Sequence, residues 1–215
     1  MRHTSDLKPE NILLDENGHV CLTDFGLSKD LTPENRKAHT FCGTPEYLAP
    51  EVIMGVGHTK EVDWWSLGIL LYELVVGIPP FYSQNVNEMY SKIQHGVLRF
   101  PPFLSDACKA FIVALLHRDP TKRLGTGAAD FNELKSHAFF APFDWDKVYR
   151  KEVTPLYTPF VKSEMDTSNF DTQFTNEPVV DSVNEKKESA LAATQDDTFS
   201  GFTFVPKAAK GLGGM

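Results

Sequence analysis

Apolar positions recur at helical spacing in the middle of the chain. Between Asp63 and Gly77, leucines stand at positions 67, 70, 71 and 74, and prolines follow at 79 and 80. This spacing predicts a helix over 63–76 that is capped at its N-terminus by Asp63. Similar patterns predict further helices near 84–95, 105–117 and 129–138. The middle of the protein is therefore expected to be helical.

Runs of β-forming residues come before this helical region. The runs ILLD and HVCLTD flank the sequence ENG, in which Asn17 and Gly18 are typical of a hairpin turn. Between Phe25 and Ala49 the chain is polar and interrupted by Gly and Pro, which favours a long functional loop. After about Asp144 the periodicity fades, and an extended or disordered tail is expected.

Composition and charge exclude several classes of protein. With 215 residues, 41% hydrophobic and 23% charged, the chain fits one soluble domain with an appendage. Its most apolar run, WWSLGILLYELVVG, is too short to span a bilayer and contains Glu73, so no transmembrane segment is expected. The net charge of -8 argues against a nucleic-acid partner. Three cysteines without metal-type spacing indicate a reducing compartment, and we expect the cytoplasm, with the nucleus as a second location.

Two short motifs hold the residues that phosphoryl transfer requires. DLKPEN at 6–11 and DFG at 24–26 supply two acids, a lysine and an asparagine. The chemistry needs a carboxylate to orient the attacking hydroxyl, a cation on the transferred group and oxygen ligands for a metal. Asp6 fits the first role and Lys8 the second, while Asn11 and Asp24 suit Mg2+. Taken singly, each motif is more often an ordinary cap or turn, so the inference depends on their combination.

Further motifs follow in an order that resembles the eukaryotic protein kinases. They are APE at 49–51, DWWSLG at 63–68 and RDPTKRLG at 118–125. The longer run TFCGTPEYLAPE and the tail FSGFTF resemble the AGC group, especially Akt and the serum- and glucocorticoid-regulated kinases. The resemblance implies a mainly α fold like an incomplete kinase C-lobe, with a short β-hairpin near the N-terminus and an extended C-terminal tail. It implies a partial kinase domain over 1–140 and an AGC C-terminal domain over 141–215.

The resemblance also assigns roles at the expected site. Asp6 would be the catalytic base, Lys8 would contact the transferred phosphate, and Thr44 would bond to both side chains. Asn11 and Asp24 would be the ligands of Mg2+, and ATP would be the phosphate donor.

Other matched positions concern the nucleotide base and the substrate. Leu13 would form the floor of the adenine pocket with Thr23 beside it, although core packing explains both residues equally well. Glu10 and Glu73 match acids that select arginine upstream of the phosphorylated residue, so protein substrates with an upstream Arg are implied. Both acids could equally be solvated charges.

Structural and regulatory positions are implied in the same way. Glu51 and Arg123 match a buried ion pair that holds the activation segment to the helical lobe, and Asp63 matches a residue that braces the catalytic loop. Three phosphorylation sites are implied, with an upstream activating kinase as a partner. They are Thr40 in the activation loop, Ser182 in the turn motif and Thr203 in the hydrophobic motif. Ser182 could equally be a serine of a solvated linker.

The match to the kinases begins abruptly at Asp6. Thr4 and Ser5 occupy the positions where these kinases carry His-Arg, and no glycine-rich loop or strand lysine comes before them. We therefore expect a truncated product or incomplete gene model in which the 63–76 helix exposes apolar surface, and no measurable Mg2+-dependent ATP binding by this chain alone. The function predicted for the intact enzyme is a serine/threonine protein kinase of the AGC group. The alternative is a catalytically dead fragment that acts as a binding or decoy module.

Overall fold

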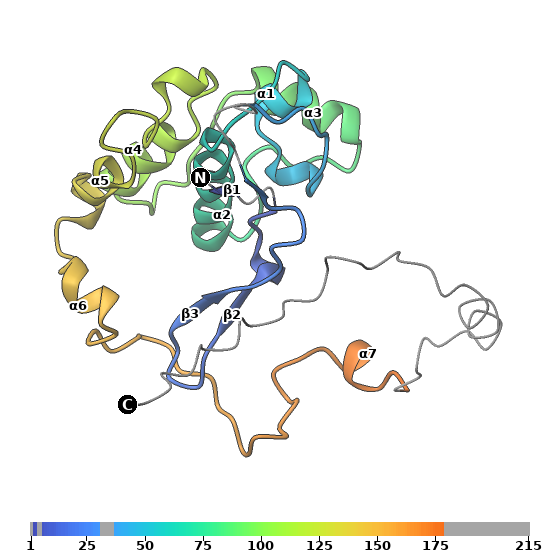
Figure 1. The fold of residues 1–215 in the computed structure, drawn as a ribbon, viewed down its shortest axis with the longest axis vertical. Helices are drawn as coiled ribbons and strands as arrows, with labels where there is room; N and C mark the ends of the chain where they lie inside the picture. The colour runs from blue at the N-terminus through green and yellow to red at the C-terminus, as the bar shows by residue number, and fades with distance from the viewer. Residues whose placement is uncertain (1, 4–5, 31–36, 179–215) are drawn as a thin grey trace, which may run out of the picture. The chain divides into compact units, whose positions relative to one another are not determined.

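The computed structural model describes residues 2–3, 6–30 and 37–178. The chain divides into two units, Met1–Asp166 and Thr167–Met215. The described part of the first unit is mainly helical, with a short hairpin near its N-terminus (Figure 1), and this confirms the predicted fold class. The second unit contributes one short helix among its described residues, α7 (Thr172–Thr175). Ser182 and Thr203 lie outside the described residues.

Among the described residues of the first unit, the longest regular element is a helix of 16 residues. The helices are α1 (Pro50–Ile53), α2 (Glu61–Val76), α3 (Val86–His95), α4 (Asp106–Leu115), α5 (Phe131–Lys135) and α6 (Trp145–Tyr149). The 3-10 helices in the described part of this unit are η1 (Pro9–Asn11), η2 (Pro45–Tyr47), η3 (Pro120–Lys122) and η4 (Ala138–Phe140). The strands β1 (Arg2–His3) and β4 (Lys29–Asp30) pair antiparallel, as do β2 (Ile12–Leu14) and β3 (Val20–Leu22).

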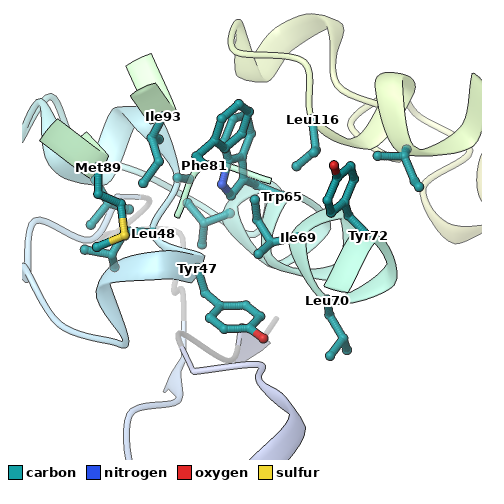
Figure 2. Close-up of a cluster of buried hydrophobic side chains, with 14 of the residues drawn as sticks. Tyr47, Leu48, Trp65, Ile69, Leu70, Tyr72, Phe81, Met89, Ile93 and Leu116 are labelled. Atoms are coloured by element: carbon teal, nitrogen blue, oxygen red, sulfur yellow. The ribbon is translucent and has the colours of Figure 1, made fainter. Parts of the chain in front are cut away.

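Helix α2 lies at the centre of the main core. Its Trp65 and Ile69 are fully buried, and the Trp65 ring stacks on Phe81 with centroids 6.1 Å apart (Figure 2). On another side, a Cβ at Gly68 would lie only 2.8 Å from Leu116 Cδ2, so a glycine lets the segment after α4 approach closely. Burial of several large apolar side chains around one helix contributes most of the stability of such a fold.

The start of α2 differs from the prediction. Asp63 is not the N-cap, because the helix begins at Glu61 and Lys60 holds the cap position. The backbone N–H of Asp63 already donates to the carbonyl of Lys60 at 3.0 Å. Helical hydrogen bonding does not need apolar residues, and acids in a first turn interact favourably with the helix dipole, so the helix starts before its apolar pattern does.

Two short helices were not predicted in the region after Asp144. Asp144 accepts hydrogen bonds from the backbone N–H groups of Asp146 and Lys147, which caps α6. Asp171 accepts one from Gln173 and caps α7 in the same way. The expectation of an irregular tail is therefore wrong over these two turns, and the aspartates were the signal that could have found them.

Candidate active site

The β2–β3 hairpin places two of the expected site residues side by side. Ile12 pairs with Leu22, and the backbone N–H of Thr23 donates to the carbonyl of Asn11 at 2.9 Å. Asn11 therefore precedes the first strand, and Asp24 follows the second, at the same open end of the hairpin. The side chain of Thr23 also donates to the Asn11 carbonyl, at 3.2 Å.

A hydrogen-bonded network surrounds the carboxylate of Asp6. Lys8 Nζ lies 2.8 Å from Asp6 Oδ2. Asp6 Oδ1 accepts hydrogen bonds from the hydroxyl of Thr44 at 2.9 Å and from its backbone N–H at 3.2 Å. Lys8 Nζ in turn donates to the same hydroxyl oxygen at 3.1 Å. Residues 36 to 38 positions apart in sequence are thus joined through one carboxylate.

Asn11 completes the contact with Asp6. Its Nδ2 donates to the Asp6 backbone carbonyl at 2.8 Å and to Asp6 Oδ2 at 3.3 Å. The side chain is nearly buried, with 9% of the residue exposed. These bonds fix which way the amide points and leave its carbonyl oxygen as the remaining polar atom of the side chain.

Asp24 has an unusual backbone at the edge of the same cleft. Its φ of 55° lies in the left-handed region, which few residues other than glycine adopt. Asp24 Oδ1 accepts the backbone N–H of Gly26 at 3.0 Å, which supports this conformation. Asp6, Asn11, Thr23, Asp24 and Phe25 line one small cleft, together with Leu7 and Leu22. The structure therefore brings together the acids and the asparagine that the sequence singled out.

The network keeps Asp6 ionised and Lys8 protonated. Burial acts to raise the pKa of Asp6, but hydrogen bonds from Lys8 and Thr44 outweigh it and hold that pKa below its ordinary value. The hydrogen bond to Asp6 is the main reason that the pKa of Lys8 is raised, and the charge of Asp24 adds to it. A carboxylate and an ammonium in contact at neutral pH are the charged groups that phosphoryl transfer uses.

Replacing Thr44 with alanine is expected to raise the pKa of Asp6, because a hydroxyl that donates to the ionised form is lost. The lowered pKa of Asp6 stabilises the folded state at pH values above the pKa of an unfolded aspartate. This contribution is lost as the pH falls through the lower pKa that Asp6 has in the folded state. The Thr44→Ala variant, in which the two pKa values lie closer together, should therefore lose less stability on acidification. A ¹³C NMR titration of labelled aspartate carboxyls measures the change. Thr44→Ser keeps the hydroxyl and should titrate like the parent; an unchanged midpoint in Thr44→Ala contradicts the expectation.

A second group of expected residues lies outside this cleft. Arg123 donates to both oxygens of Glu51, at 2.7 and 2.9 Å, and both side chains are buried. Arg123 also donates to the carbonyls of His117 and Glu61, so its guanidinium is held on several sides. Asp63, in the first turn of α2, borders the same apolar hollow as Leu7 of the Asp6 loop.

Tyr47 was missed by the sequence analysis and connects two expected elements. Its hydroxyl donates to Glu73 Oε2. Burial, then this hydrogen bond, raises the pKa of Tyr47, and the charge of Glu10 adds to the effect. Glu73 is therefore not a simple solvated charge, whereas Glu10 is exposed. The YLAPE run could not reveal this pairing, because Tyr47 and Glu73 are 26 residues apart.

The remaining expected residues lie on more open surfaces. Leu13 is 41% exposed, so core packing does not explain it within the described chain. Thr23 is half-buried at the cleft, and Thr40 is exposed. Within residues 2–3, 6–30 and 37–178, no group of three or more His, Cys, Asp or Glu gathers closely enough to hold a metal ion. Across that same part of the chain, no helix has the length and apolar character needed to cross a membrane.

Comparison with known proteins shows the family of this chain. Residues 3–140 match the family described as protein kinase domain, and residues 161–204 match the protein kinase C terminal domain. The chain belongs to the protein kinase family, in its AGC group.

Curated relatives resemble almost the whole chain. It is 51% identical over 200 residues to the serine/threonine-protein kinase YPK2/YKR2 of Saccharomyces cerevisiae. The aligned region covers 93% of this chain and 29% of that protein. Its identity to the serine/threonine-protein kinase gad8 of Schizosaccharomyces pombe is 50%, over 93% of this chain and 34% of gad8. The identity to the serine/threonine-protein kinase Sgk1 of Gallus gallus is 46%, over 94% of this chain and 47% of Sgk1. The chain thus spans less than half the length of these relatives.

Proposed function

We propose that this chain supplies the catalytic and metal-binding residues of a serine/threonine protein kinase that transfers the γ-phosphate of ATP to protein hydroxyls. The observation that carries the proposal is the network in which Lys8, Asn11 and Thr44 all contact the carboxylate of Asp6. The same cleft holds Asp24. A network that only stabilised the loop would not need a second carboxylate, that of Asp24, in the same cleft.

In this proposal each residue acts through the geometry described above. Asp6 accepts a hydrogen bond from the substrate hydroxyl and orients its oxygen for attack, while Thr44 holds the carboxylate in place. Lys8 places positive charge where charge develops on the transferred group.

The donor set of the cleft fits Mg2+. Asn11 Oδ1 and the carboxylate of Asp24 are hard oxygen donors, and Mg2+ is commonly held by one or two such groups with phosphate oxygens and water. When bound, Mg2+ with ATP supplies the phosphoryl group and neutralises charge on it. Leu13 and Thr23 would lie beside the adenine of that ATP.

Roles in substrate selection and regulation are proposed for the other residues that the resemblance assigned. Glu73, held by Tyr47, and exposed Glu10 would attract an arginine upstream of the phosphorylated residue. Exposed Thr40 would be phosphorylated by an upstream kinase. Ser182 and Thr203 remain proposals from the sequence motifs.

A kinase assay of the longest product of the gene that contains these residues tests the function. We expect phosphate transfer to a serine peptide with an upstream arginine, and complete loss when EDTA removes Mg2+. Replacing the peptide arginine with alanine should lower kcat/KM by roughly 10- to 100-fold, the range for a hydrogen bond to a charged group. Glu73→Gln should remove most of that preference, with Glu88→Gln, at an exposed position of α3, as the control. Phosphate transfer at an unchanged rate after removal of Mg2+ refutes the proposal.

Binding without catalysis is a second candidate, favoured by one observation. An apolar hollow lies between the hairpin and α2 and is lined by Leu7, Ile12, Val20, Leu22, Leu67, Leu70 and Leu74, among others. Such surfaces often take part in protein contacts. If the longest gene product transfers no phosphate but competes with a related kinase for its activator, the binding reading replaces the catalytic one.

A further inference from the structure

The segment over 151–158 lies against the turn of the β2–β3 hairpin. Lys151 Nζ donates to Asp15 Oδ2 at 3.0 Å. A Cβ placed on Gly18 would lie 2.1 Å from the carbonyl oxygen of Tyr157 and 3.0 Å from Pro155 Cβ, so only a glycine allows this approach. The turn and the segment therefore touch at two places, one ionic and one backbone to backbone.

Two threonines in this segment share the same surroundings. Thr154 and Thr158 are exposed, have irregular backbone, and are each followed by proline. Both line an open hollow beside the hairpin, together with Asp15, His19 and Lys151. Proline after a threonine biases that threonine toward extended backbone, which is the shape a kinase groove accepts from its substrate.

A third Thr-Pro pair shows that the dipeptide alone does not make a site. Thr44 precedes Pro45, but its hydroxyl donates to Asp6 and accepts from Lys8, and it is not exposed. A kinase would have to break both bonds to reach that oxygen. The hydroxyls of Thr154 and Thr158 stand on exposed residues in a segment without regular structure.

We propose that Thr154 and Thr158 are phosphorylation sites for a proline-directed protein kinase, distinct from Thr40, which is followed by Phe41. In the reaction, the threonine oxygen forms a bond to the γ-phosphorus of ATP, and the bond from that phosphorus to the bridging oxygen breaks. ADP leaves, and the hydroxyl proton passes to a base of the proline-directed kinase.

The added phosphate would change the contact between the segment and the hairpin. A phosphothreonine carries a charge of about −1.5 to −2, against −1 for the carboxylate of Asp15. The Lys151–Asp15 ion pair is exposed, and such pairs are weak, so the phosphate would draw Lys151 away and repel Asp15. Because this hairpin carries Asn11 and Asp24 at its other end, the modification acts on an element of the kinase site.

Phosphorylation of the full 215-residue chain by a purified cyclin-dependent kinase and ATP tests the sites. Thr32, which precedes Pro33 outside the described residues, is changed to alanine so that its phosphate does not count. Mass spectrometry should find phosphate on Thr154 and Thr158 at roughly ten times the level on Thr44 or more, because Thr44 must first lose two hydrogen bonds. A reaction without the added kinase gives the background.

Two results overturn the assignment. In one, a peptide over 150–161 is phosphorylated but the intact chain is not, which shows that the docked segment is inaccessible. In the other, neither is phosphorylated, which shows that these Thr-Pro sequences are not recognised. Thr154→Ala with Thr158→Ala should remove the phosphate at these positions and is not expected to unfold the chain, since both residues are exposed.

A ³¹P NMR titration tests whether the phosphate takes Lys151. The midpoint of phospho-Thr154 is expected to be lower by roughly 0.2–0.7 of a pH unit with Lys151 present than in Lys151→Gln, the range of an exposed ion pair. Asp15 and His19 also face the hollow and are present in both proteins. An aspartate with an ordinary pKa of about 4 stays ionised while a phosphate with a pKa of about 6 titrates, so Asp15 carries the same charge in both titrations. Equal midpoints refute the proposed exchange of partners.

Discussion

Replacing Asp6 with alanine is expected to lower the turnover of the longest gene product that contains this chain by roughly 10²–10⁴, the contribution of a positioned base. The carboxylate is held by Thr44, Lys8 and Asn11. Its removal therefore also takes away the group that these three side chains contact in common. Initial rates of phosphate transfer to an arginine-containing peptide, at saturating ATP and Mg2+, measure the change. KM for the peptide should move much less than kcat.

The control for this experiment is an acid on the surface of the same unit. Asp106 lies in the first turn of α4, and its side chain is fully exposed near Lys109. Asp106→Ala should leave turnover within about a factor of two, since surface substitutions away from special features have small effects. A turnover in Asp6→Ala equal to that of Asp106→Ala would remove Asp6 from the proposed mechanism.

Replacing Glu51 with alanine is expected to lower the free energy of unfolding by about 3–5 kcal/mol, because Arg123 would remain buried without its counter-charge. Arg123 cannot turn outward easily, since it also donates to the carbonyls of His117 and Glu61. Urea unfolding followed by tryptophan fluorescence measures the loss. The guanidinium of Arg123 lies 5.3 Å from the ring centroid of Trp65, so the probe reports on the same place.

An exposed ion pair provides the matched control. Arg150 and Glu152 make a similar two-bond contact, at 2.7 and 3.1 Å, but both side chains are about half exposed. Glu152→Ala should cost no more than about 1 kcal/mol. If the two variants lose similar free energies of unfolding, burial adds nothing to the contribution of the Glu51–Arg123 pair.

The sequence predicted the elements whose signals are local. The leucine spacing predicted α2, and Asn17 with Gly18 predicted the hairpin turn, which the structure confirms with a φ of 86° at Gly18. The predicted start of α2 came too late in the sequence, because the cap residue Lys60 and the first helical residue Glu61 join the first turn through backbone hydrogen bonds that leave no apolar pattern.

Contacts between distant residues depended on the family resemblance or were missed. Nothing local in GTPEY shows that Thr44 reaches Asp6, and that expectation came from the resemblance to kinases. The contact of Tyr47 with Glu73 was not foreseen. Nor was that of Lys151 with Asp15, which are 136 positions apart. Such pairings are decided by tertiary packing, which a single sequence encodes only indirectly.

The hydrogen-bonded pairing of β2 with β3, which includes Ile12 and Leu22, limits where the hairpin can accept inserted residues. Because paired strands keep a fixed register, the spacing between the amide of Asn11 and the carboxylate of Asp24 is set by the ladder and not by the turn. Lengthening the turn at Glu16 and Asn17 would leave that spacing intact, whereas inserting one residue within either strand would displace one donor relative to the other.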